Sequence, residues 1–348
     1  MATLFLHVGM HKTGTSAIQD SLAALPEGRG PRLIYLDVPN MSGQIKKALE
    51  DPEFLRASLG YGSVEAYARE QPKLRDRLAR LLAETGDRDA VLSAEAFSPL
   101  GEKEFDDFLS LVRHDTIRVI AYARAPQSAM ASSLQERIRR GGITRFRPHS
   151  WVPQYRRSLE KFEKLGLEIV CYDRATLHNG CVVQDFCRRV GIEIRPEEVR
   201  NTNESFGRDA IVLAFCRNVW RESRGLERNN SMELEPLVGD LATPKFKLHG
   251  RLIRPAVRRR RDEIDWVEQR MGRSFPEWKQ GGNRDAILER EDLLKVSDEA
   301  ADWLARHVEG YDGSRDPMVV GAAVEALVLG ERRKLSPLAR LTRRIGAA

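Results

Sequence analysis

Short apolar runs alternate along this chain with longer segments whose apolar residues recur every three or four positions. The runs predict buried strands at Thr3–Val8, Arg32–Asp37, Ala90–Ala94, Ile117–Ala123 and Leu167–Tyr172. The longer segments predict helices at Ser16–Leu25, Ser42–Ser58, Val64–Glu84, Glu102–Val112, Pro126–Arg140, Trp151–Leu165 and Cys181–Gly191. Strands that alternate with helices are typical of a parallel sheet covered on both faces. The sequence therefore predicts an α/β fold, a three-layer α/β/α arrangement around a central parallel sheet.

The pattern changes after about residue 200, where the chain becomes more charged and its periodicity weakens. We predict a core domain over residues 1–215 and a mainly helical C-terminal extension over residues 216–348. The extension contains four consecutive arginines, Arg258–Arg261. A solvated helix face is the first interpretation of this charge run, and a positively charged rim for an acidic acceptor is the alternative.

The segment between the first predicted strand and the first predicted helix has the composition of an anion-binding loop. Gly9 and Gly14 occupy the glycine positions of the pattern G-x-x-x-x-G-K-[ST], and Ser16 occupies its final hydroxyl position. Thr15 stands where that pattern has lysine, and the lysine of this loop is Lys12. A strand, a tight loop and a helix N-terminus direct backbone N–H groups and the helix dipole at one point. The sequence predicts a P-loop-like site for a phosphate-like group, with its cation inside the loop.

A second segment has the residues of a phosphate site. Arg124 ends the fourth predicted strand, Pro126 suits the first position of the next helix, and Ser132 follows eight residues after the arginine. A guanidinium binds two phosphate oxygens at once, and a helix hydroxyl adds a neutral donor. Ligands of parallel sheets bind at the carboxyl ends of strands, so we expect this pair on the same sheet edge as the loop. An amphipathic helix with a solvated polar face is the alternative interpretation.

These two segments resemble the sulfotransferase family, most closely its bacterial and carbohydrate-type branches. The run His11-Lys12-Thr13-Gly14-Thr15-Ser16 is similar to the family's 5′-phosphosulfate loop, [HP]-K-x-G-[TS]-[TS], and the spacing of Arg124 and Ser132 is similar to that of its 3′-phosphate site. The resemblance covers residues 1–215. It implies that the sulfuryl donor 3′-phosphoadenosine 5′-phosphosulfate, without a metal, is bound by His11, Thr13, Gly14, Thr15, Ser16, Arg124 and Ser132.

The resemblance also implies a reaction, the in-line transfer of a sulfuryl group to an acceptor hydroxyl, which we expect on a glycan or glycolipid. Lys12 would then act on the leaving phosphate. Glu95 ends the predicted strand Ala90–Ala94 on the same sheet edge and is the candidate base, in a segment similar to the S-x-E run of carbohydrate-type relatives. A helix-capping or solvated glutamate is the alternative role for Glu95. His11 and His149 are rival bases.

The chain also departs from the family pattern. Arg124-Ala125-Pro126 lacks the acidic or amide residue that commonly stands between the arginine and the proline, and no Arg-Lys-Gly loop is recognisable near the C-terminus. The residues that contact adenine therefore stay unassigned. Asn201–Ser205 resembles the Asn- and Ser-containing loop that follows the core in many sulfotransferases, and we expect the extension after it to contribute to the acceptor site.

Composition fits a globular enzyme. The 348 residues are 41% hydrophobic and 31% charged, with a net charge of +6 that suits an anionic cofactor. No basic patch interleaved with aromatic residues suggests nucleic-acid binding. The four cysteines show no C-x-x-C spacing, so we expect reduced thiols, no zinc site and a cytoplasmic protein. We also expect no signal peptide and no membrane span, and at most peripheral membrane contact through the basic tail Arg332–Arg344.

Two other functions are compatible with a P-loop-like site. A kinase or nucleoside triphosphatase would need a magnesium ligand, and the apolar runs that end in Asp37 and Asp173 offer one. Thr15 at the usual lysine position argues against this function. A non-catalytic nucleotide-binding protein on the same fold is the other alternative, and it would bind the nucleotide without transferring any group.

Overall fold

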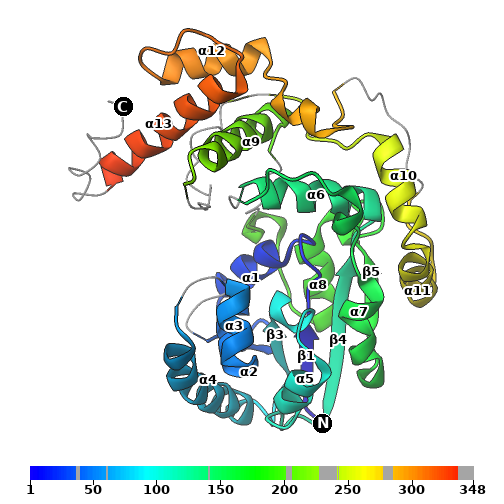
Figure 1. Cartoon of the computed structure of the whole chain (residues 1–348). Helices are drawn as coiled ribbons and strands as arrows, with labels where there is room; N and C mark the ends of the chain where they lie inside the picture. Colours follow the sequence, from blue (N-terminus) through cyan, green and yellow to red (C-terminus); the bar gives the residue numbers. More distant parts are fainter. Residues whose placement is uncertain are drawn as a thin grey trace. The chain divides into compact units, whose positions relative to one another are not determined.

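A sheet of five parallel strands forms the centre of the first half of the chain (Figure 1). Its spatial order is β2-β3-β1-β4-β5. β1 pairs with β3 on one side, where Leu4 lies opposite Ala90, and with β4 on the other, where Leu4 lies opposite Ile117. The chain thus adds β2 and β3 on one side of β1 and later adds β4 and β5 on the other side. The strands are β1 (Thr3–His7), β2 (Arg32–Leu33), β3 (Ala90–Ser93), β4 (Thr116–Ala123) and β5 (Glu168–Cys171).

The computed structural model describes residues 1–36, 40–59, 62–139, 142–200, 206–226, 241, 243–276 and 285–335. The α-helices are α1 (Thr15–Ala23), α2 (Ser42–Leu49), α3 (Pro52–Leu59), α4 (Val64–Glu84), α5 (Glu102–Leu109), α6 (Pro126–Arg139), α7 (Tyr155–Leu159), α8 (Val182–Val190), α9 (Arg208–Ser223), α10 (Gly250–Arg258), α11 (Arg261–Met271), α12 (Asp298–His307) and α13 (Pro317–Leu335). The short 3₁₀ helices are η1 (Glu95–Phe97), η2 (Pro148–Trp151), η3 (Glu160–Leu165), η4 (His178–Gly180), η5 (Pro196–Glu198) and η7 (Arg290–Leu294).

The chain divides into two compact units that interleave along the sequence. The first unit joins Met1–Pro126, Pro153–Glu204 and Arg260–Glu277, and the second joins Gln127–Val152, Ser205–Arg259 and Trp278–Ala348. The predicted division at residue 215 treats the chain as two consecutive pieces, whereas each compact unit draws on three separate segments. The packing of segments far apart in sequence produces this arrangement, and no local pattern encodes it.

Both faces of the sheet in the first unit are covered by helices. On one face, α1 and α8 bury Ile18, Leu22 and Phe186 against Val91 and Tyr122 of the strands. On the other, η3 packs on β4, and its ring Phe162 meets Phe105 of α5. The five parallel strands and their helices confirm the predicted α/β fold with a central parallel sheet.

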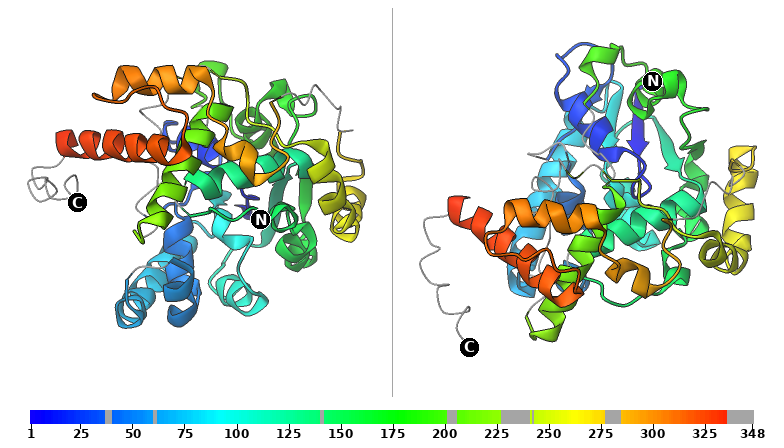
Figure 2. Two further views of the ribbon diagram at one scale, coloured as in Figure 1. Left: turned by 45° about the horizontal axis from the view of Figure 1, so that its top comes forward. Right: turned by 90° about the horizontal axis from the view of Figure 1, so that it is seen from above.

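The second unit is helical and has its own core. α13 packs along α9, as both views in Figure 2 show, and α12 contacts both helices. The fully buried guanidinium of Arg217 on α9 donates to Glu325 on α13 at 2.6 Å, and Arg221 pairs with the same carboxylate. A charged group inside an apolar core thus has its counter-ion on the neighbouring helix. The mainly helical C-terminal part expected from the sequence is confirmed.

Two helix predictions are wrong because of proline. Ser42–Ser58 forms two helices, since the chain turns extended at Glu50 and α3 starts anew at Pro52. Trp151–Leu165 is also not one helix, because Val152, the residue before Pro153, is extended. In contrast, α4 spans the predicted Val64–Glu84, with a Ser63 cap whose hydroxyl accepts from Ala66 N–H at 3.1 Å. The predicted strand Arg32–Asp37 is shorter in the structure. β2 ends at Leu33, Leu36 forms only an isolated bridge, and Asp37 lies outside the described residues.

Candidate active site

Three segments that follow adjacent strands meet at one edge of the sheet. Residues 8–14 follow β1 at the sheet centre, Glu95 comes two residues after β3, and Arg124 comes directly after β4. Because all three strands are parallel, their carboxyl ends lie at the same edge. β1 is also the strand from which the sheet is extended in both directions, and such a point is where open α/β sheets bind ligands.

The loop after β1 depends on left-handed backbone conformations. Gly9 has φ +91°, Lys12 has φ +63° and Gly14 has φ +85°. A Cβ atom on Gly14 would lie 2.6 Å from Val182 Cγ1, so space as well as backbone conformation requires glycine there. Gly14 caps α1 without a side-chain hydrogen bond, and its carbonyl accepts from Ile18 N–H at 3.0 Å. The first turn of α1 therefore presents its N–H groups without a competing side-chain acceptor.

Side chains on both sides of the loop hold its shape. Thr13 is fully buried, and its hydroxyl donates to the Met10 carbonyl at 2.6 Å. Arg124 Nη1 donates to the Lys12 carbonyl at 3.2 Å. Met10 N–H also donates to the Tyr122 carbonyl, which ties the loop to β4. Lys12 is half-buried and stands at the loop position where the backbone is left-handed.

Two tyrosines contact Arg124. Tyr155 donates its hydroxyl to the Arg124 carbonyl at 2.5 Å, and the guanidinium lies over the Tyr172 ring at 5.7 Å from the ring centre. Burial lowers the pKa of Arg124, and the two tyrosines partly offset this effect. The Tyr172 ring also reaches the loop, because its hydroxyl lies 3.5 Å from the position of a Cβ on Gly14. Arg124 is thus a half-buried cation beside the start of α1, and a bound anion would compensate its charge.

Glu95 and His11 form a pair beside the loop. His11 Nδ1 lies 2.9 Å from Glu95 Oε2, with the imidazole 62% exposed and the carboxylate 27% exposed. Burial by itself raises the pKa of Glu95, but the hydrogen bond and charge of His11, the Thr15 hydroxyl and the charge of His7 outweigh it. The net pKa of Glu95 is lowered, so the group is a carboxylate at neutral pH.

Buried polar groups lie beneath the loop. The Thr15 hydroxyl is close enough to Glu95 to lower its pKa, yet it makes no hydrogen bond of normal length. His7 is fully buried and pairs through Nδ1 with the Ser93 hydroxyl at 2.8 Å, while its Nε2 has no partner. Gln19 donates to the Ser93 carbonyl, and its own amide oxygen is also without a partner. Buried polar atoms usually have partners, so these unpaired atoms favour a polar ligand or water at this edge.

The structure brings most of the predicted site residues together. Placed in or beside the loop of the first unit are His11, Lys12, Thr13, Gly14, Thr15, Ser16, Glu95 and Arg124. Ser132 lies on α6 in the second unit, and its partnership with Arg124 stays a prediction from spacing. Asn201–Ser205, the tail from residue 336 and the side chain of His149 lie outside the described residues.

Sequence reasoning missed several neighbours of the loop, chiefly His7, Tyr155 and Tyr172. A histidine inside the apolar run of β1 is an unusual polar interruption, and this signal could have pointed to His7. Tyr172 follows β5 directly, at the sheet edge where ligands bind. Tyr155 has no comparable signal, because only tertiary packing brings it to Arg124.

Two findings on the described residues bear on the kinase alternative. The described residues contain no group of three or more His, Cys, Asp or Glu side chains placed to hold a metal ion. The Asp173 carboxylate accepts from Ala175 N–H at 3.1 Å and so holds the turn after β5.

Free thiols are present at Cys171, Cys181, Cys187 and Cys216. Among the described helices, none combines the length and apolar character that a membrane span needs.

Comparisons with known proteins give little beyond this geometry. No protein-family model and no curated protein matches the chain. A solved structure, a sulfotransferase domain from the curacin biosynthetic pathway, is similar with a TM-score of 0.37 and 14% sequence identity, over 79% of this chain and 99% of that domain. A likeness of this size assigns no activity, so any functional conclusion rests on the residues of the site.

Proposed function

We propose that this protein is a sulfotransferase that moves a sulfuryl group from 3′-phosphoadenosine 5′-phosphosulfate to an acceptor hydroxyl. The observation that carries the proposal is the meeting of three chemically distinct groups at the ends of three adjacent strands. They are the lysine-containing anion loop after β1, the half-buried Arg124 after β4 and the carboxylate of Glu95 after β3. Together they supply an anion cradle, cations and a proton acceptor.

The residues of the loop fit a phosphosulfate group. The start of α1 has no side-chain cap, and the buried Thr15 hydroxyl has no normal hydrogen bond, so both offer donors to an anion. The backbone N–H groups of residues 13–16 would hold the donor's 5′-phosphosulfate, and Arg124 would hold its 3′-phosphate together with Ser132. When bound, the donor supplies a transferable sulfuryl group on a phosphate leaving group.

Lys12 is the proposed cation for the leaving phosphate. The backbone at Lys12 is left-handed, and Arg124 donates to its carbonyl, so the backbone of the residue has a defined place in the loop. An ammonium group there would stabilise the negative charge that develops on the bridging oxygen. A side chain without charge would leave that oxygen uncompensated while the backbone cradle stayed intact.

Glu95 is the proposed base, acting with His11. Because its pKa is lowered, Glu95 is ionised at neutral pH but is a weak proton acceptor by itself. Its hydrogen bond to His11 Nδ1 offers a second route, in which Glu95 orients the imidazole and the more exposed ring takes the proton. Substitution of His11 separates the two routes. Direct transfer to Glu95 predicts that His11→Asn keeps part of the turnover, and transfer through His11 predicts that His11→Asn loses as much turnover as Glu95→Gln.

The proposed acceptor is a glycan or glycolipid hydroxyl, a class that comes from the sequence resemblance. A radiolabelled sulfuryl donor incubated with a panel of saccharides, glycolipids and small alcohols tests it. Transfer to a saccharide supports the class, and transfer confined to another hydroxyl replaces it. The reaction itself is refuted if no acceptor in the panel or in a cell extract becomes labelled while the donor is bound.

Site variants test the assignment of roles. Lys12→Ala should lower turnover by about a hundredfold or more, as removal of one charge-stabilising donor does in other enzymes. Lys73→Ala, at an exposed position of α4, is the matched control and should leave turnover unchanged. Glu95→Gln should lower turnover with little change in donor affinity. Turnover that requires ATP and magnesium would favour the kinase alternative, and donor binding without transfer would favour a nucleotide-binding protein.

A further inference from the structure

One short segment of this protein carries a large excess of positive charge. Residues 241–261 contain eight lysines and arginines and no carboxylate, whereas the whole chain has a net charge of +6. Subtracting these eight charges from +6 leaves the remainder of the chain at −2. Ordinary solvated helix faces carry both signs of charge interspersed. A segment that alone turns an acidic chain basic is therefore a candidate for an electrostatic interaction surface.

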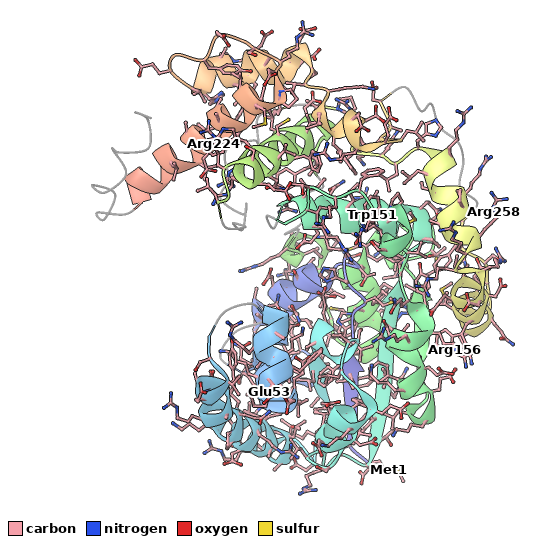
Figure 3. The ribbon with its side chains drawn as sticks, in the orientation of Figure 1. Met1, Glu53, Trp151, Arg156, Arg224 and Arg258 are labelled. Carbon is pink, nitrogen blue, oxygen red and sulfur yellow. The ribbon has the colours of Figure 1, made fainter. Side chains whose placement is uncertain are left out.

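The second unit presents six of these cations on its surface as what we term the basic strip. All are exposed, and Figure 3 labels Arg258, which projects from α10. The six residues of the basic strip are Lys245, Lys247, Arg251, Arg254, Arg258 and Arg259. Apart from Arg254, they have no ion pair with any acidic side chain of the described residues. Most of the positive charge of the strip is thus available to a partner.

The fold holds the basic strip in place. Lys245 and Lys247 alternate with buried Phe246 and Leu248, so both lysines lie on the same side of an extended segment. That segment is tied by backbone hydrogen bonds, because Ile287 N–H donates to the Lys247 carbonyl at 2.9 Å and His249 N–H donates to the Ile287 carbonyl at 2.8 Å. A partner would meet a surface that is already ordered, which lowers the entropy lost on binding.

The helical part of the strip repeats its charge at a regular interval. Arg251, Arg254 and Arg258 are three and four residues apart on α10, on the side opposite the buried Ile253 and Ala256. At a rise of about 1.5 Å per residue, neighbouring arginines are about 4.5 Å and 6 Å apart along the helix. Carboxylates at positions i, i+3 or i+4 and i+7 of another helix repeat at the same interval. The strip therefore matches an acidic helix in both sign and spacing.

Other polyanions fit the strip less well. Between Lys245 and Arg259 the described structure has no exposed large apolar side chain that could insert into a membrane. The only aromatic ring of the segment besides the His249 imidazole, Phe246, is buried, so the strip has no exposed platform on which nucleic-acid bases would stack. A partner held by charge alone, with a regular repeat of carboxylates, suits these features better.

We propose that the basic strip docks an acidic helix of a partner protein. The probe is a fluorescently labelled alanine-based helical peptide with glutamates at every third or fourth position. Its anisotropy should report binding to the full chain at low salt, and the binding should weaken when the ionic strength rises past about 0.15 M. The same peptide with glutamine in place of glutamate should not bind.

Charge-reversal variants locate the binding. Arg251→Glu with Arg258→Glu should weaken peptide binding by about tenfold or more at low salt, because two attractions become repulsions. The matched control reverses Arg145 and Arg306, two exposed arginines elsewhere in the same unit that have no ion pair among the described residues, and should retain most of the affinity. Thermal unfolding of both variants checks that the fold is intact.

Two results would overturn the proposal. One is equal affinity of the strip variant and the control variant for the peptide. The other is a single-stranded oligonucleotide, dextran sulfate or an anionic lipid vesicle that binds more tightly than the peptide and loses its binding in the strip variant. That second result would assign the strip to a different class of partner.

Discussion

Replacing Gly14 with alanine tests the close packing at the start of α1. The left-handed conformation of Gly14, φ +85°, costs a residue with a Cβ about 1–2 kcal/mol. The added Cβ would also lie 2.6 Å from Val182 Cγ1, well inside the contact distance of about 3.5–4.0 Å for two carbon atoms. Overpacking of this kind costs about 1–3 kcal/mol. The two effects together predict that Gly14→Ala lowers the free energy of unfolding by about 2–5 kcal/mol.

Gly28 provides the matched control. It has a similar φ, +90°, but a Cβ there would meet no atom within 4 Å. Gly28→Ala should therefore cost only the backbone contribution of about 1–2 kcal/mol. The difference between the two variants, measured by thermal or urea unfolding of the full chain, isolates the steric contribution of Val182.

A second-site substitution sharpens the test. Val182→Ala removes the atom that the new Cβ would meet, so the combined variant should be less destabilised than the sum of its parts, by about 1–3 kcal/mol. The reasoning is refuted if Gly14→Ala is no more destabilising than Gly28→Ala, or if the effects of Gly14→Ala and Val182→Ala simply add. Either result would mean that α1 and α8 do not pack closely at the loop.

Two further predictions concern buried charge. Burial lowers the pKa of His7 from 6.5 to about 4. Between these pH values the unfolded chain therefore binds more protons than the folded chain. The free energy of unfolding should fall by about 3 kcal/mol as the pH falls from 6.5 to 4. His7→Asn should remove that part of the pH dependence in unfolding curves recorded from pH 7 to pH 4, and an unchanged slope would contradict it. Glu325→Leu should destabilise the second unit by about 3–5 kcal/mol, because the fully buried Arg217 loses its carboxylate partner. Adding Arg217→Met should recover much of that loss in calorimetry, and additive losses would argue against the buried pair.

The sequence predicted the strands and most helices because their patterns are local. The apolar runs of β1 and β4 and the Ser63 cap of α4 can be recognised without knowledge of the fold. Pro52 and Pro153 are local signals too, and each breaks a helix that the apolar periodicity alone would continue. The interleaving of the two units has no local signal, because it depends on which distant segments share a core.

The site was predictable in part for the same reason. The loop of residues 9–16 and its helix are contiguous, so their motif could be recognised in the sequence. The pairing of His11 with Glu95 spans 84 positions and depends on β1 lying next to β3, with His7 opposite Ser93. Alternation of strands and helices predicts a parallel sheet but not the order of its strands. The contacts of Arg124 with Tyr155 and Tyr172 likewise follow from tertiary packing alone.

The central claim, a donor site built by the loop and Arg124, is tested most directly by calorimetric titration with adenosine 3′,5′-bisphosphate, with ATP and magnesium as the comparison. The account predicts that the bisphosphate binds more tightly than ATP and that Arg124→Ala weakens this binding strongly, because the substitution removes a half-buried cation that also holds the Lys12 carbonyl. Tighter binding of ATP with magnesium, or no binding of either nucleotide, would contradict it.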